Sequence, residues 1–144
     1  MTERVVEVEH GSPGHADAVA VRRTVFVEGQ GVPPSMEVDE HEPDCRHFVA
    51  YDGADAVGAA RLRPLDGETA KVERVAVVES RRGEGWGDRL MDAVESTARE
   101  ASVDRLVLHA QTPVEGFYER RGYRTTSDVF EEAGIPHVEM EREP

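Results

Sequence analysis

The sequence predicts an α/β fold with an antiparallel beginning and a parallel crossover in its middle. Two apolar segments flank a hairpin signal, Asp52-Gly53-Ala54-Asp55, which is typical of antiparallel strands. A third apolar segment leads through a glycine-rich turn, 81–87, into an amphipathic helical pattern, and another apolar segment, 105–110, follows that pattern. Because the chain has 144 residues without a repeat or a linker, residues 1–144 are expected to form one domain.

The N-terminal part is predicted to contain a short strand, one helix and a long irregular connection. Residues 4–9 alternate valines with polar residues, as a strand does. Ser12 is a hydroxyl N-cap and Pro13 suits the first helical position, so a helix is expected from there to about residue 27. The segment 28–45 is rich in prolines, glycines and carboxylates, so we expect no regular structure there.

Three strands are predicted in the middle of the chain. Residues 46–51 and 56–63 form the two arms of the hairpin. A second turn, Asp66-Gly67, leads into the third strand, 70–78.

The third predicted strand breaks the alternation of its valines. Val72 lies on an even position, whereas Val75 and Val77 lie on odd ones. One extra residue near Glu73-Arg74, a β-bulge, would place all three valines on the same face. A strand that is covered on both faces needs no bulge, but the bulge is the interpretation we prefer.

The C-terminal half is predicted to add two helices and three strands. From Trp86 to Glu100, apolar residues recur at every fourth position, which indicates an amphipathic helix. A short helix at 114–121 ends at Gly122, which serves as its C-cap. The expected strands are 105–110, 123–126 and 137–141, the last two joined by a loop that contains Gly134-Ile135-Pro136.

The composition is strongly acidic and almost free of lysine. Thirty acidic and seventeen basic residues give a formal net charge of −13, and Lys71 is the one lysine. This charge repels nucleic acid and anionic membranes, so neither is expected as a partner. An acidic surface with so little lysine also suggests adaptation to high salt, a hypothesis that a lack of stabilisation between low and molar KCl would contradict.

Neither a metal centre nor a membrane segment is expected. Cys45 has no second cysteine to pair with, and the histidines do not combine with it at the spacing of a zinc site. The N-terminus lacks the apolar run of a signal peptide, and no segment reaches the roughly 20 apolar residues of a membrane span. These observations predict a cytoplasmic protein without a resident metal.

The turn after the third predicted strand has the features of an anion-binding site. Gly83, Gly85 and Gly87 let the backbone approach an oxyanion, and the first N–H groups of the following helix lack intrahelical partners. Arg81 and Arg82 add positive charge, so a phosphate or a pyrophosphate suits the turn. A Walker A loop would need a lysine, and a Rossmann fingerprint would need G-x-G-x-x-G spacing; the chain has neither. A tight surface turn with two arginines is the alternative.

The segment VERVAVVESRRGEGWGDRLM, 72–91, resembles the acetyl-CoA-binding segment of the GNAT superfamily of N-acyltransferases. The motif of that superfamily, Q/R-x-x-G-x-G/A, reads Arg82-Gly83-Glu84-Gly85-Trp86-Gly87 here. GFYERRGY at 116–123 is similar to the FYxxxGF element, with Tyr123 in place of the phenylalanine. VFVEGQGVP, EVDEHEPDCRHF, LHAQ and EEAGIPHVEM are similar to the ElaA-like branch, although Gly29 interrupts the usual EQ-x-VP pattern.

The resemblance implies a GNAT-type fold: a mixed, mostly antiparallel central sheet with helices on both faces and a splayed parallel strand pair. It implies direct transfer of an acetyl group from acetyl-CoA to an amine, without a metal, in a family whose members are commonly homodimers. A non-catalytic acyl-CoA-binding module is the alternative. The residues assigned to acetyl-CoA by the resemblance are Val75, Ala76 and Val77 beside the pantetheine, and Arg81, Arg82, Gly83, Gly85, Trp86 and Gly87 at the pyrophosphate.

The same resemblance assigns catalytic and acceptor residues. Tyr118 matches the tyrosine that protonates the leaving thiolate in many GNAT enzymes, with core packing as the alternative. Glu73 is the leading candidate for the general base, with a solvent-facing strand residue as the alternative. The acidic segment 37–44 either attracts a cationic amine or is plain solvated surface. The residues assigned to the acceptor are Glu28, His109, Gln111 and His137, and three of these, Glu28, His109 and His137, are further candidates for the base together with Glu132.

Overall fold

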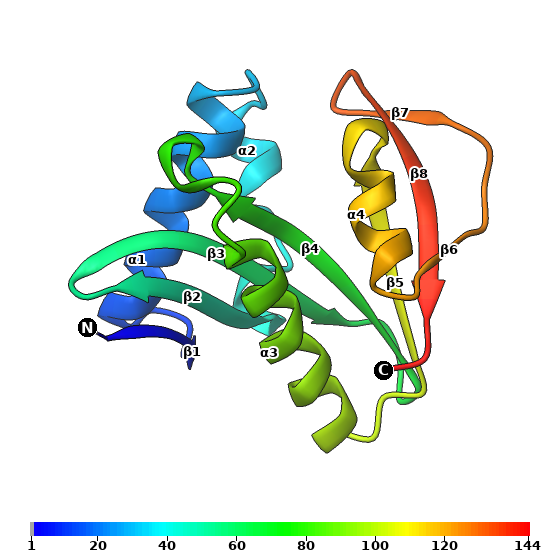
Figure 1. Ribbon diagram of the computed structural model, residues 1–144, viewed down its shortest axis with the longest axis horizontal. Coiled ribbons are helices and arrows are strands. Elements are labelled where there is room, and N and C mark those ends of the chain that lie inside the picture. The colour runs from blue at the N-terminus through cyan, green and yellow to red at the C-terminus, as the bar shows by residue number, and fades with distance from the viewer. Residues whose placement is uncertain (1) are drawn as a thin grey trace.

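The sheet of this protein is mixed and open, and the computed structural model describes it over residues 2–144 (Figure 1). Within that range the strand order is β1-β2-β3-β4-β5-β8-β6, and β7 pairs with β8. The strands are β1 (Glu3–Val8), β2 (Arg46–Asp52), β3 (Asp55–Pro64), β4 (Thr69–Val77), β5 (Arg105–Gln111), β6 (Arg124–Thr125), β7 (Phe130–Glu132) and β8 (Ile135–Arg142). The helices are α1 (Pro13–Arg22), α2 (Pro34–Glu37), α3 (Trp86–Glu100) and α4 (Glu115–Arg120), with shorter π- or 3₁₀-helical segments at Arg23–Glu28, Glu42–Asp44, Glu79–Arg81 and Thr112–Val114.

Among the strands of residues 2–144, one pair of neighbours is parallel, β4 with β5, and the strands on either side of it run antiparallel. The parallel ladder runs from Thr69–Arg105 to Val72–Leu108 and stops there, although both strands continue. The two strands therefore form a V that is closed at Val72–Leu108 and open at their C-terminal ends. The predicted fold, mostly antiparallel with a splayed parallel pair, is confirmed.

Helices cover both faces of this sheet, as predicted. In Figure 1, α3 crosses in front of the sheet and α1 lies behind it. Ala18 and Val21 of α1 pack against β2 and β3 in one apolar cluster. The other cluster contains Tyr118 of α4 together with the predicted stripe of α3, Trp86, Leu90, Val94 and Ala98, all buried. No helix within residues 2–144 combines the length and the apolar character that crossing a membrane requires.

The predicted bulge in β4 is present. Ala59 of β3 faces Ala76 and Arg61 faces Glu73, so three steps along β4 match two along β3. Arg74, at the bulge, has φ of 58°. As a result Val72, Val75 and Val77 all contact the cluster beneath α3, whereas Ala76 contacts the cluster beneath α1. The alternative of a regular strand without a bulge is excluded.

The connection 28–45 is more ordered than we expected. Pro33 and Pro34 start the short helix α2, and a 3₁₀ turn follows at Glu42–Asp44, so the prediction of no regular structure is wrong. The carboxylates of this segment do not simply contact solvent. Glu37 and Glu42 are buried and bind the guanidinium of Arg22, at 2.9 and 2.7 Å. These ion pairs fix the segment against α1.

The first helix continues beyond Arg22 as a π-helix, Arg23–Glu28. The Gly29 N–H donates to the Thr24 carbonyl at 3.0 Å, five residues back, in the wider hydrogen-bond pattern of this helix type. A π-helical turn holds an additional residue, so it accommodates the glycine that interrupts the EQ-x-VP pattern. A Cβ added to Gly29 would lie 2.6 Å from the Val25 carbonyl oxygen, so the position favours glycine.

The C-terminal strands differ from the prediction. Gly134-Ile135-Pro136 is not a loop between the last two strands, because Ile135 and Pro136 belong to β8. An unpredicted strand, β7, pairs with the start of β8 through a tight turn at Ala133-Gly134, where both φ angles are positive. Alanine rarely adopts a positive φ, so the residue at position 133 does not indicate a turn of this kind. Pro136 is tolerated because β8 pairs with β5 only from His137 onward, so at Pro136 the strand has, among the described strands, a partner on the β7 side alone.

Candidate active site

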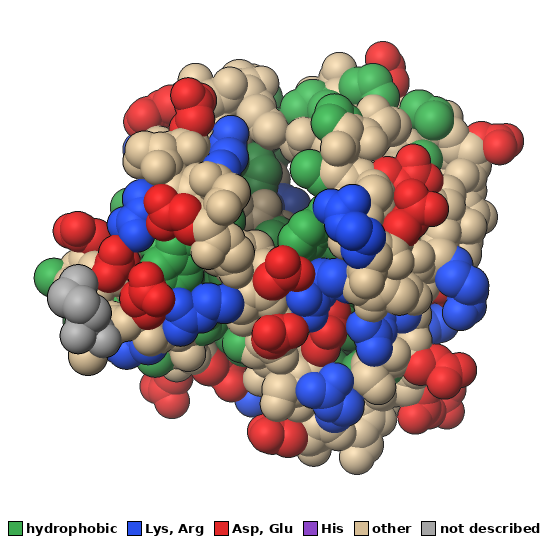
Figure 2. All heavy atoms as spheres, viewed as in Figure 1, with side chains coloured by type: hydrophobic (Ala, Val, Ile, Leu, Met, Phe, Trp, Pro, Cys, Tyr) green, Lys and Arg blue, Asp and Glu red, His purple; other side chains and the backbone are tan. Residues whose placement is uncertain are grey.

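The open end of the V between β4 and β5 is a cleft of about 970 Å³. Its lining runs from the glycine turn along β4 to Tyr118 and on to the side chains of His109 and His137. Figure 2 shows the surface hollowed at the upper centre, between the elements around α1 on one side and α4 with β8 on the other. One continuous cleft thus joins the glycine turn to the side chains of Tyr118, His109 and His137.

The glycine turn has the geometry of an anion site. Gly83 and Gly85 have φ of 79° and 89°, and a Cβ on either would have no heavy atom within 4 Å, so the backbone here is open. Gly85 is the N-cap of the 15-residue helix α3, and no side chain of residues 2–144 caps that end. The first N–H groups of α3 are therefore available to an anionic ligand, and the helix dipole favours negative charge there.

The two arginines of the turn differ in their partners. Arg81 binds Asp52 at 2.7 Å and Glu84 at 3.0 Å, so two carboxylates already neutralise its charge. Arg82 donates through Nε to the Val77 carbonyl at 3.0 Å and has no carboxylate partner among residues 2–144. Both line the cleft, but Arg82 is the cation better placed to pair with a ligand.

The strand that precedes the turn offers a backbone edge to the cleft. Val75, Ala76 and Val77 line it, and beyond Val72 the β5 side of β4 has no strand partner in the described part of the chain. Ala76 and Val77 pair with β3 on the other side. A strand edge of this kind can hydrogen-bond to an extended ligand as it would to another strand.

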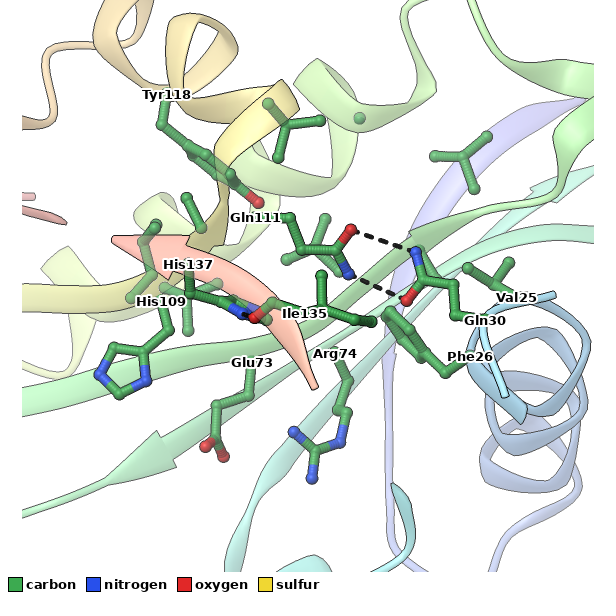
Figure 3. Close-up of a pocket in the computed structure, with 18 of the residues that line it drawn as sticks. Val25, Phe26, Gln30, Glu73, Arg74, His109, Gln111, Tyr118, Ile135 and His137 are labelled. Atoms are coloured by element: carbon green, nitrogen blue, oxygen red, sulfur yellow. Dashed lines mark hydrogen bonds between the residues drawn. The ribbon is translucent and has the colours of Figure 1, made fainter. Parts of the chain in front are cut away.

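Tyr118 lies in α4 with its hydroxyl turned into the cleft (Figure 3). Its ring packs edge-on against Phe117 and Tyr123, at centroid distances of 5.0 and 5.6 Å, so the side chain is also part of the core. The hydroxyl has no hydrogen-bond partner among the described residues. Burial, reinforced by the charge of Glu95, raises the pKa of Tyr118 despite the opposing charge of Arg121, which keeps the phenol protonated at neutral pH as a hydrogen-bond donor.

Glu73 lies at the bulge and is tied into an ionic network. Its carboxylate binds Arg61 at 2.7 Å, Arg63 at 3.1 Å and Lys71 at 3.4 Å. Only 8% of the side chain is exposed, so the alternative of a solvent-facing strand residue does not hold. Burial alone would raise the pKa of Glu73, but the three cations outweigh it and hold the pKa below its usual range. A carboxylate in this state is a weak proton acceptor.

The histidines and Glu132 come together on the wall formed by β5, β7 and β8. Glu132 accepts from His109 Nδ1 at 2.8 Å and lies 3.8 Å from His137 Nε2. The ring of Phe130 packs edge-on against the ring of His109 and stacks on the ring of His137. The hydrogen bond from His109, helped by the nearby charges, lowers the pKa of Glu132 despite burial. Three of the five candidates for the base are therefore neighbours.

The orientation of His137 distinguishes it from His109. Its Nδ1 lies 2.6 Å from the Ile135 carbonyl, which can only accept, so Nδ1 carries the hydrogen and Nε2 of the neutral ring keeps a lone pair. In Figure 3 the ring of His137 points toward the middle of the cavity, whereas the ring of His109 points away from Tyr118. His137 is thus the histidine whose ring faces the space beside Tyr118.

Gln111 pairs with a residue that sequence analysis did not single out. Its amide exchanges two hydrogen bonds with Gln30, of 2.9 and 3.2 Å, across the cleft (Figure 3). Glu28, which we had assigned to the acceptor, is not among the residues that line the cleft, whereas Gln30 is. The sequence did contain a sign of this difference. Gly29 interrupts the usual EQ pattern, so the glutamine of that pattern comes at position 30.

The acidic segment 37–44 is divided between a buried ion-pair cluster, which contains the carboxylates of Glu37 and Glu42, and the exposed side chains of Glu40 and Asp44. Glu42 accepts hydrogen bonds from Arg22, Arg61 and His15, which hold its pKa well below its usual range although burial opposes them. The ligand atoms of His15, Glu42 and His47 lie within 4.8 Å of one another, a distance at which a metal could bind. The carboxylate is already occupied by two guanidinium groups, so the donors present favour an ion-pair cluster.

The protein-family model described as "Acetyltransferase (GNAT) domain" matches residues 14–144. The chain belongs to the GNAT acetyltransferase family. It is 44% identical over 125 residues to "Uncharacterized N-acetyltransferase YjcF" of Bacillus subtilis, covering 86% of this chain and 89% of that protein. It is 35% identical over 127 residues to protein ElaA of Escherichia coli, covering 85% and 83%.

Solved structures agree with this assignment. The crystal structure of Escherichia coli ElaA superposes with a TM-score of 0.84 and 29% identity, covering 99% of this chain and all of that one. An acyl-CoA N-acyltransferase from Pseudomonas aeruginosa has a TM-score of 0.84 at 26% identity, with 98% and 99% covered. The predicted resemblance to the GNAT family and to its ElaA-like branch is confirmed. The protein is therefore a member of a family of acyltransferases.

Proposed function

We propose that this GNAT protein transfers the acetyl group of acetyl-CoA directly to an amine in the cleft between β4 and β5. The observation that carries the proposal is the continuity of that cleft. It joins an uncapped helix N-terminus, the unpaired edge of β4, the hydroxyl of Tyr118 and the pair of histidines. A diphosphate ligand with an extended arm matches this succession of features.

Acetyl-CoA would bind with its pyrophosphate at the backbone of Gly83, Gly85, Trp86 and Gly87. Arg82, which has no carboxylate partner among residues 2–144, would supply local positive charge in a protein whose net charge is −13. The pantetheine arm would lie along Val75–Val77 as a further strand does. The acetyl group then lies near the closed end of the V, beside Tyr118.

In the reaction the acceptor nitrogen loses two protons and the leaving thiolate gains one. An amine with a pKa of ~10 must lose its first proton before its nitrogen attacks the thioester carbonyl. As the C–N bond forms and the C–S bond breaks, Tyr118 donates its proton to the leaving thiolate, and the second proton lost by the nitrogen restores the phenol. We assign the base to His137, because its Nε2 has a lone pair and its ring faces the cavity. Glu132 holds the adjacent His109, and Glu73, with its lowered pKa and three cationic partners, positions the strand.

The acceptor end of the cleft is lined by both signs of charge, and Gln30 and Gln111 bridge it. The proposal includes an amine acceptor, a cytoplasmic location, a reaction without a resident metal, and the homodimer that the family resemblance implies. Turnover after treatment with a chelator tests the metal, and the molar mass in solution tests the dimer.

The experiment is a thiol-release assay with acetyl-CoA and a panel of primary amines. We expect free CoA to appear with at least one amine, and we expect Tyr118→Phe to lower kcat by about 10²-fold or more. The affinity of this variant for acetyl-CoA should stay near that of the wild type, because the lost hydroxyl acts on the leaving group. Binding of acetyl-CoA without transfer to any amine would instead favour a non-catalytic acyl-CoA-binding module. Unchanged turnover would return Tyr118 to a purely structural role.

A further inference from the structure

Lysine is nearly absent from this chain, and its single occurrence lies in the cleft. Sixteen of the seventeen basic residues are arginines, and the remaining one is Lys71 in β4. Arginine stays charged in proteins, whereas a lysine amine can lose its proton and act as a nucleophile. A single lysine among sixteen arginines suggests chemistry that a guanidinium cannot perform.

Charge neutralisation alone does not account for this lysine. The one ionic contact of Lys71 within residues 2–144 is with Glu73, at 3.4 Å. Glu73 already binds Arg61 and Arg63 at 2.7 and 3.1 Å, so its carboxylate has two closer cationic partners. The contact of Lys71 is the longest of the three, and the amine is the partner most easily released.

The position of Lys71 in the sheet places it at the end of the cleft where the acetyl group of acetyl-CoA is proposed to lie. Lys71–Val107 and Val72–Leu108 are the last two pairs before β4 and β5 separate, so Lys71 lies at the closed end of the V. The side chain lines the cleft and is 15% exposed. A pantetheine that runs down β4 from the glycine turn would point its thioester toward this end, on the proposed function.

We propose that Lys71 is an acetylation site of the protein itself, modified by acetyl-CoA bound in the same cleft; this inference rests on the proposed function. The ammonium of Lys71 first gives one proton to solvent, and its neutral nitrogen attacks the thioester carbonyl carbon. As the C–N bond forms, the C–S bond breaks and the thiolate takes a proton from Tyr118. The second proton lost by the nitrogen restores the phenol. The products are acetyl-Lys71 and CoA with a free thiol.

Acetylation would change the acceptor end of the cleft. The amide is uncharged, so Glu73 loses its third cation, and the added acetyl group fills space where an acceptor amine would bind. Because an amide is stable to hydrolysis at neutral pH, the modification would persist once made. We therefore expect the acetylated protein to transfer acetyl groups to added amines more slowly than the unmodified protein.

The test is intact-mass spectrometry of the protein after incubation with acetyl-CoA and no added amine, followed by peptide mapping. We expect one acetyl group per chain on Lys71, at a rate constant that does not depend on protein concentration. Lys71→Arg should gain none at this position. Gly85→Asp, which obstructs the proposed pyrophosphate site, should acquire the acetyl group far more slowly.

The outcomes separate this proposal from the proposed function, because acetyl-CoA binding and transfer to amines are measured on the same sample. Binding and transfer with Lys71 unmodified would overturn the acetylation site and leave the function intact. Neither binding nor transfer would overturn both. Equal labelling of the wild type, of Gly85→Asp and of protein unfolded in urea would show adventitious chemical acetylation, and it would also overturn the proposal.

Discussion

Gly85→Asp tests whether the glycine turn binds the pyrophosphate. Gly85 has φ of 89°, and a Cβ there would meet no heavy atom within 4 Å, so the new side chain fits sterically and points into open space. The substitution adds a negative charge next to the uncapped end of α3. A bound pyrophosphate would then face a carboxylate in a turn that now offers it backbone N–H groups and the guanidinium of Arg82.

The expected magnitude follows from the charges. A unit charge about 5 Å from a diphosphate with two negative charges costs about 1.7 kcal/mol even at the dielectric constant of water, and more in a partly buried cleft. This corresponds to a loss of at least about 15-fold in affinity for acetyl-CoA. The positive φ costs a non-glycine residue about 1–2 kcal/mol. The new carboxylate also interacts favourably with the N-terminus of α3, which offsets about 0.3–1 kcal/mol of that cost, so the free energy of unfolding should fall by about 1 kcal/mol.

Gly53→Asp is the matched control. Gly53 also has positive φ, 61°, and open space around its Cβ, but it lies in the β2–β3 turn and does not line the cleft. Both variants therefore place an aspartate at a positive φ and add the same charge. Isothermal titration with acetyl-CoA should show weakened binding for Gly85→Asp alone, while chemical denaturation shows similar losses of stability. Equal affinities of the two variants would refute the assignment of the pyrophosphate site.

Two further predictions concern the histidine wall and the buried ion pairs. His137→Gln should lower kcat by about 10²-fold or more, as expected for loss of a general base, while His109→Gln lowers it much less; the reverse order would move the base to His109. Glu42→Gln leaves Arg22 and Arg61 without their shared carboxylate and should cost about 3–5 kcal/mol of stability at pH 7. Because the folded-state pKa of Glu42 lies below its ordinary 4.5, its contribution is present above that pH and is lost as the pH falls toward the folded-state value. Denaturation between pH 7 and pH 3 should thus show a smaller acid-induced loss for Glu42→Gln, and an equally steep loss in both proteins would contradict this explanation.

Local patterns predicted much of the fold. The valines of β4 change from an even position, Val72, to odd positions, Val75 and Val77. This change located the bulge, because successive side chains of a strand lie on alternate faces of the sheet. Recurrence at every fourth residue located α3. The strand β7 escaped prediction because its turn uses Ala133 at a positive φ, a choice that tertiary contacts and not local preference determine.

The site was predictable where one segment supplies it and not where distant segments meet. The glycine turn lies within a few residues, so its anion-binding character could be inferred from its sequence. The Gln30–Gln111 pair joins residues 81 positions apart, and the ion pairs of Arg22 join α1 to the 28–45 connection. Polar residues in those segments looked solvent-exposed in the sequence, and only the packing of α1 and β3 shows that Glu37 and Glu42 are buried.

The central claim is that one cleft binds acetyl-CoA from the glycine turn to Tyr118. A crystal structure with an unreactive acetyl-CoA analogue, in which a methylene group replaces the thioester sulfur, tests it most directly. We predict the pyrophosphate against the N–H groups of Gly83–Gly87, the pantetheine along Val75–Val77, and the methylene within hydrogen-bonding reach of the Tyr118 hydroxyl. A pyrophosphate bound away from the turn, or an acyl group directed out of the V, would contradict the claim.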